Sequence, residues 1–303
     1  MARPLAMASS AALAAAALTI RAAGRLSPGL GAAAALPLFM NTRPRMRMRP
    51  SDAPTMLTAR RSTVPVPGLH GRGGEAVAYA WGPTDSPVLL VHGWGGRAAQ
   101  YAPLVQAFHD AGIGAVAFDA PAHGESPGRG TYIVDFHAAI AELARRHGPF
   151  RAAVGHSFGA FATLIAVADG LETSRVAAIS STTDTAFMIS SFARGVGLAP
   201  AAAEALRDRF ARHILPREPR VFERYNAVDR AFPEDVPCLF VHDTADPIVP
   251  LAEAERIFEA RKPNARLVTT TGLGHYRTVS APAVVEAVTA FIADGTPGPS
   301  ARP

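Results

Sequence analysis

Three side chains that can carry out acyl-transfer chemistry follow apolar, strand-like runs at distant points of this 303-residue chain. Ser157 stands in "RAAVGHSFGAFATL", where an apolar run ends in Gly-His-Ser-Phe-Gly and a small-residue run follows. Asp246 lies in "FVHDTADPIVP", and His275 lies in "TTGLGHYR". A serine hydroxyl is a weak nucleophile near neutral pH and needs a base to take its proton. A histidine can be that base, and a carboxylate can orient the histidine.

Strands and helices that alternate along the chain are expected to position these residues. The first two strand-like runs flank a glycine-rich turn and predict an antiparallel pair, and the later runs each precede or follow a helical pattern. This rhythm predicts a mostly parallel sheet with helices on both faces. Strands are expected at 62–68, 75–82, 87–93, 114–121, 150–157, 175–182, 236–243 and 265–272, and helices at 99–112, 132–148, 161–170, 252–262 and 282–294.

One interval interrupts the alternation. Residues 183–235 carry helical stretches such as "AAAEALRDRFARHIL" and no convincing strand, which predicts a small helical lid inserted above the strand ends. The core is then divided into 63–182 and 236–294. Residues 1–62 form an Ala/Arg-rich N-terminal extension, and the tail 295–303 is expected to be disordered.

The Gly-His-Ser-Phe-Gly segment matches the G-x-S-x-G nucleophile elbow, placed between a predicted strand and a predicted helix. In this the chain resembles the α/β-hydrolase superfamily from about residue 62 to 294. The resemblance implies an α/β-hydrolase fold. It also implies a triad in the chain order serine, acid, histidine, with Ser157 as nucleophile, Asp246 as acid and His275 as base. Asp243, three residues before Asp246, is the alternative acid.

Two further loops resemble segments of that superfamily. "VHGWGGRA" resembles its oxyanion turn, and this implies that the backbone N–H groups of Trp94 and Phe158 hold the oxyanion. "FDAPAHGES" resembles a loop found in many members. We interpret its Asp119, His123 and Ser126 as residues that order the loop, with His123 as an alternative base.

The remaining histidines and the cysteine do not indicate a metal site. His92, His156 and His242 lie near the same loops, but none pairs with a carboxylate at ligand spacing on one helix. The single cysteine, Cys238, excludes an internal disulfide and a cysteine-based zinc cluster, and its apolar setting predicts a buried strand. We therefore expect neither a metal nor a cofactor.

The positive charge is confined to the start of the chain. Residues 1–62 hold nine Arg and one Asp, a balance of +8, whereas the rest of the chain has a balance of −3. The body thus lacks the basic stripe of a nucleic-acid-binding protein. The extension could pack on the domain, contact an anionic membrane surface or act as an export signal, but its first apolar run is too short to span a bilayer. A cytoplasmic location is expected, with membrane association or export as alternatives.

Together these features predict a cofactor-free serine hydrolase that cleaves a carboxylic ester through an acyl-enzyme intermediate. Acyltransferase, thioesterase and peptidase activities use the same residues and remain alternatives, as does a non-catalytic binding protein of the same fold. The apolar stretch "TAFMISSFARGVGL" in the predicted lid favours a small to medium hydrophobic acyl substrate. No substrate-binding residue and no oligomeric state can be assigned from the sequence.

Overall fold

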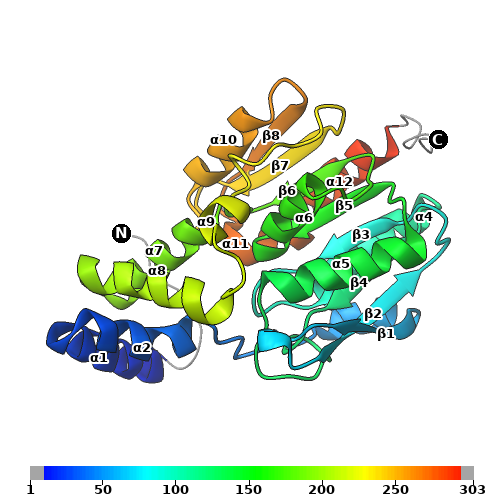
Figure 1. Ribbon diagram of the computed structural model, residues 1–303. Helices are drawn as coiled ribbons and strands as arrows, with labels where there is room; N and C mark the ends of the chain where they lie inside the picture. The colour runs from blue at the N-terminus through cyan, green and yellow to red at the C-terminus, as the bar shows by residue number, and fades with distance from the viewer. Residues whose placement is uncertain (1–9, 295–303) are drawn as a thin grey trace.

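A computed structural model describes residues 10–294 of the chain; the predicted disordered tail 295–303 lies outside the described residues. At its centre is one eight-stranded sheet in the order β1-β2-β4-β3-β5-β6-β7-β8 (Figure 1). β2 is antiparallel to β1 and to β4, and the other neighbours are parallel. The strands are β1 (Arg60–Val66), β2 (Gly74–Trp81), β3 (Val88–Val91), β4 (Ala115–Asp119), β5 (Ala152–His156), β6 (Val176–Ile179), β7 (Cys238–Asp243) and β8 (Ala265–Thr270).

The central strands are apolar because helices cover both of their faces. Every residue of β3 to β7 is buried, as continuous apolar runs require. One face carries a core with Phe136, Phe161 and Ile257, and the other a core with Phe108 and Phe291. The covering helices are α5 (Ile133–His147), α6 (Phe158–Ala168) and α10 (Leu251–Ala260) on the first face, and α4 (Ala102–Asp110) and α12 (Pro282–Ala293) on the second.

A second group of helices lies beside the sheet and joins two distant parts of the chain. α1 (Ser10–Leu26) and α2 (Pro28–Phe39) form a hairpin that packs against α8 (Pro200–Ile214), with α7 (Thr185–Val196) and α9 (Val221–Arg224) next to it (Figure 1). The Phe39 ring of α2 meets Phe192 and Phe210 edge-on, at centroid distances of 5.3 and 5.7 Å. The helices of the N-terminal extension thus pack directly on those of the predicted lid.

The α1–α2 crossing is close because both helices carry glycine where they meet. A Cβ atom added to Gly31 would lie 2.6 Å from the Cα of Gly24, so position 31 has no room for a side chain. Within residues 10–294, no helix combines the length and the apolar character that a bilayer crossing requires.

The remaining helical segments are single turns in the connections: α3 (Ala53–Leu57), α11 (Gly274–Arg277), and the 3₁₀ turns η1 (Pro50–Asp52), η2 (Leu69–Gly71), η3 (Ala98–Tyr101) and η4 (Thr278–Ser280). Residues 41–49 connect α2 to the first of these and run past the carboxyl ends of the parallel strands. The pocket-forming loops all lie at that end of the sheet.

Candidate active site

Ser157 stands on a sharp turn between β5 and α6. Its backbone has φ 55° and ψ −122°, a conformation that a residue with a side chain rarely adopts. The flanking glycines make the turn fit, since a Cβ on Gly155 would lie 2.4 Å from the Cα of Ala160. A Cβ on Gly159 would lie 2.1 Å from the carbonyl oxygen of Val91. Close packing of β5, α6 and β3 therefore requires glycine on both sides of the serine.

His275 and Asp246 complete a linear chain of hydrogen bonds that begins at Ser157. The His275 Nε2 atom is 2.8 Å from the Ser157 Oγ, and its Nδ1 atom is 2.7 Å from the Asp246 Oδ2. His275 lies in the single-turn helix α11 rather than in an open loop, and its side chain and that of Asp246 are almost inaccessible to water. The structure thus brings together three residues that were expected to form one site, from the carboxyl ends of β5, β7 and β8.

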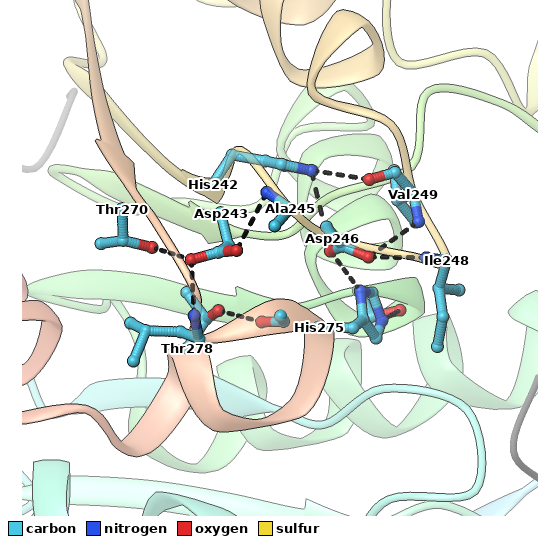
Figure 2. Close-up of polar contacts among 12 residues, drawn as sticks. His242, Asp243, Ala245, Asp246, Ile248, Val249, Thr270, His275 and Thr278 are labelled. Carbon is cyan, nitrogen blue, oxygen red and sulfur yellow. Dashed lines mark hydrogen bonds and ion pairs between the residues drawn. The ribbon is translucent and has the colours of Figure 1, made fainter. Parts of the chain in front are cut away.

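The hydrogen bonds of Asp246 fix the protonation of the imidazole. The carboxylate can only accept, so the Nδ1 atom of His275 carries the proton and Nε2 accepts from the serine hydroxyl. The other carboxylate oxygen accepts the backbone N–H groups of Ile248 and Val249, at 2.8 and 3.0 Å (Figure 2). Burial raises the pKa of Asp246, but the hydrogen bond and charge of His275 together with these N–H groups outweigh it and lower the pKa below its ordinary value.

Asp243, the alternative acid, has a different set of partners. Its carboxylate accepts the hydroxyl of Thr270 at 2.8 Å and the N–H groups of Leu273 and Ala245 at 2.9 and 3.0 Å (Figure 2). Burial would raise the pKa of Asp243, but these hydrogen bonds lower it below its ordinary value. Asp243 therefore ties the end of β7 to the loop that carries His275, and it forms no hydrogen bond to the imidazole among the described contacts.

Other histidines surround the site and are held neutral by burial. His92 donates from Nδ1 to the Gly93 carbonyl and accepts the Ala120 N–H at Nε2, and burial lowers its pKa to about 4. His156 donates from Nε2 to the carbonyl oxygen of His275 at 2.9 Å. Burial and the neighbouring His275 lower the pKa of His156 to about 3. These rings position the loops by binding backbone atoms.

His242 makes a similar backbone contact on β7. Its Nε2 donates to the Val249 carbonyl at 2.8 Å, and burial lowers its pKa. Within residues 10–294 no group of three or more His, Cys, Asp or Glu side chains is arranged to hold a metal ion.

The loop after β4 is ordered by the residues expected to order it. The Asp119 carboxylate accepts hydrogen bonds from the N–H groups of Ala98 and Glu125, at 2.6 and 2.8 Å, and the Ser126 hydroxyl donates to the Asp119 carbonyl.

His123, the alternative base, lies in the same loop. It is fully buried, and burial lowers its pKa to about 3. Its Nδ1 faces the Pro121 carbonyl at 3.0 Å instead of Ser157, so this imidazole is not placed to act as the base.

A small cavity lies beside the Ser157 hydroxyl. It has a volume of about 70 Å³. Trp94, one of the two residues expected at an oxyanion site, lines it, and the indole ring meets Phe158 edge-on at 5.2 Å. As the first residue of α6, Phe158 has a backbone N–H without an acceptor inside its helix. The assignment of these two N–H groups to an oxyanion stays a prediction.

Several residues that line this cavity were not anticipated from the sequence: Met46, Gln100, Ile248 and Tyr276. No residue of the predicted lid 183–235 is among the lining residues. The side chain of Gln100 is buried, and within the described part of the chain neither its oxygen nor its nitrogen has a hydrogen-bond partner. No sequence motif identifies these four residues as lining the cavity. Each lies in a segment whose course relative to the cavity is known only from the three-dimensional structure.

The comparison with known families agrees with this geometry. A sequence profile described as the alpha/beta hydrolase family matches residues 88–288, which include Ser157, Asp246 and His275. The chain belongs to the alpha/beta hydrolase family. No curated protein matches this alpha/beta hydrolase at a significant level.

Solved structures share the fold at low sequence identity. An esterase from Pyrococcus furiosus is 19% identical, with 84% of this chain and 96% of that chain covered and a TM-score of 0.56. A monoacylglycerol lipase from Paleococcus ferrophilus is 24% identical, with 71% and 97% covered and a TM-score of 0.53. Mouse alpha/beta hydrolase domain-containing protein 10 is 15% identical, with 78% and 98% covered and a TM-score of 0.59. At these identities the likeness extends to the fold, and the chemistry has to be argued from the site.

Proposed function

We propose that this alpha/beta hydrolase cleaves carboxylic esters through an acyl-enzyme intermediate on Ser157. The observation that carries the proposal is the hydrogen-bonded series from the Ser157 Oγ to the His275 Nε2 and from the His275 Nδ1 to the Asp246 carboxylate, with distances of 2.8 and 2.7 Å. The two structural neighbours that are an esterase and a monoacylglycerol lipase agree with it.

The first half of the reaction forms the acyl-enzyme. As the Ser157 Oγ attacks the carbonyl carbon of the ester, its proton passes to the Nε2 of His275. Asp246 stabilises the imidazolium that results and keeps Nδ1 protonated. The attack gives a tetrahedral intermediate, whose oxyanion accepts hydrogen bonds from the backbone N–H groups of Trp94 and Phe158. When the tetrahedral intermediate collapses, the bond to the leaving alcohol breaks and the alcohol takes the proton from Nε2.

The second half restores the enzyme. A water molecule gives a proton to the Nε2 of His275 while its oxygen attacks the acyl carbon, and the carboxylic acid leaves as Ser157 recovers its proton. The unpaired amide of Gln100 lines the same cavity and is free to bind a polar group of the substrate or the water. No cofactor enters any of these steps.

Labelling of the serine together with ester hydrolysis tests the proposal. We expect a fluorophosphonate probe to modify the wild-type protein at Ser157 and to leave Ser157→Ala unmodified. The same substitution should lower kcat for 4-nitrophenyl acetate by at least about 10⁴-fold. Ser190→Ala is the matched control, because that hydroxyl donates to a carbonyl within α7, away from the cavity. A wild-type protein that the probe leaves unmodified would show that the serine is not activated and favour the non-catalytic alternative.

A further inference from the structure

The cavity beside Ser157 is lined in part by a segment that lies more than a hundred residues before the serine. We name residues 41–46 the N-terminal strap. Met46, its last residue, lines the same cavity of about 70 Å³ as Ser157, His275 and Tyr276. The residues before it border a separate, open hollow of about 690 Å³ lined by Asn41, Arg43, Pro44 and Arg45. The strap therefore borders both the cavity beside Ser157 and a more open surface hollow.

Hydrogen bonds hold the strap against the loops that surround the serine. The N–H of Met46 donates to the Gly95 carbonyl at 2.8 Å, and the indole N–H of Trp94 donates to the Asn41 carbonyl at 2.8 Å. Both acceptor and donor belong to the glycine-rich loop after β3, which also lines the cavity. The backbone from which the Met46 side chain projects is thus fixed relative to the proposed oxyanion site.

Arg45 attaches the strap to a second loop. Its guanidinium donates to the carbonyl oxygens of Gly124, Ser126 and Gly128, at distances of 3.2, 3.0 and 3.1 Å. Three hydrogen bonds from one planar group hold the segment in a single orientation, because the guanidinium presents its donors in a fixed geometry. These hydrogen bonds make the strap a fixed part of the wall of the pocket.

We propose that Met46 determines which acyl groups this enzyme accepts, and that the intact cavity selects short acyl chains. This inference rests on the proposed function. The cavity has room for about five water-sized groups, since one water needs roughly 10–15 Å³. No residue of 183–235 lines it, so the acyl limit is set by the strap together with the core loops. Removing the Met46 side chain enlarges the cavity, because Met46 is part of its lining.

Substitutions at Met46 in the full-length protein test this assignment. The quantity measured is the ratio of kcat/KM for 4-nitrophenyl octanoate to that for 4-nitrophenyl acetate. Met46→Ala should raise the ratio about tenfold, because a few methylene-sized groups in an apolar pocket change discrimination by that order. Met46→Phe, which fills the cavity further, should lower the ratio. Met48→Ala is the control, since this methionine is 37% exposed and does not line the cavity.

A second readout separates this inference from the proposed function. Rates of Ser157 modification by short-chain and long-chain alkyl fluorophosphonates should shift in the same directions as the hydrolysis ratio. Thermal unfolding midpoints near the wild-type value show that the variants are folded. If both Met46 variants are folded and labelled but keep the wild-type ratio, Met46 does not determine acyl size. A serine that resists both probes in the wild-type protein overturns the proposed function and this inference with it.

Discussion

Asp243, the last residue of β7, and Asp246, in the loop that follows, show how two neighbouring carboxylates come to differ in chemistry. Both are ionised at neutral pH because hydrogen bonds lower the pKa of each. The carboxylate oxygens of Asp243 accept hydrogen bonds from the Thr270 hydroxyl and from backbone N–H groups, which fixes the loop that carries His275. Asp246 keeps one oxygen for backbone N–H groups and turns the other to His275. Only Asp246 can therefore select the imidazole tautomer.

Substitution of each aspartate by asparagine should separate these roles. Asp246→Asn should lower kcat by about 10⁴-fold while the protein remains folded, because an amide no longer keeps Nδ1 protonated and Nε2 free to accept. Asp243→Asn, the matched variant three residues away, should keep kcat within about tenfold of wild type and instead lower the free energy of unfolding by about 1–3 kcal/mol, since hydrogen bonds to a charged acceptor become weaker. Steady-state kinetics and urea unfolding measure both effects. Equal losses of kcat in the two variants would contradict the assignment.

The elements of the sheet could be predicted from the sequence for a physical reason, whereas the assignment of Ser157, Asp246 and His275 came from the resemblance of their segments to those of the family. Strands buried on both faces read as continuous apolar runs, and in a parallel sheet their carboxyl ends meet at one edge. The residues that follow β5, β7 and β8 therefore lie at the same edge of the sheet, although β6 and β7 stand between β5 and β8. The expected antiparallel pair at the start of the sheet is confirmed as β1 and β2.

The N-terminal strap could not be predicted in this way. Its contacts with the glycine-rich loop use the backbone atoms of Met46 and Asn41, which leave no periodic pattern in the side chains. The docking of α2 on α8 depends on the edge-on contact of Phe39 with Phe210, which is also not visible in either segment alone. Contacts between distant, non-repeating segments require the three-dimensional path of the chain.

At the scale of elements, the packing of the serine turn is tested at Gly159. A Cβ added there would meet the carbonyl oxygens of Val91 and His92 at 2.1 and 2.4 Å, and these belong to a buried strand end that cannot move aside. Gly159→Ala should therefore lower the free energy of unfolding by about 3 kcal/mol or more. Gly29→Ala is the control: its new Cβ would lie 3.7 Å from the Ser27 Oγ, and stability should change by less than about 1 kcal/mol. If Gly159→Ala unfolds at the same urea concentration as the wild-type protein, the turn is not tightly packed.

Across the whole molecule, the polar groups buried around the site link catalysis to stability. His92, His123 and His156 lie at 0–2% exposure, and each binds a backbone carbonyl that orders a loop. Burial lowers their pKa values to about 4, about 3 and about 3, respectively. The folded protein therefore keeps these imidazoles neutral at pH values where the unfolded chain protonates them. The arrangement that holds the loops around Ser157 is consequently sensitive to acid.

The sign of this dependence follows from the direction of the shifts. With a histidine pKa near 6.5 in the unfolded chain, each buried histidine contributes stability that is fully present above about pH 6.5. The contribution is lost as the pH falls toward the folded pKa, by up to about 1.4 kcal/mol per pH unit per histidine.

His123→Gln tests this dependence on acid. The substitution should reduce the slope of the unfolding free energy against pH by up to about 1.4 kcal/mol per pH unit between about pH 4.5 and 5.5. His109→Gln, at a side chain that is 71% exposed, is the control. Urea unfolding across this pH range measures the slopes. Parallel lines for the wild-type protein and His123→Gln would mean that the buried ring is protonated in the folded state, and that the loop after β4 takes up this charge without loss of stability.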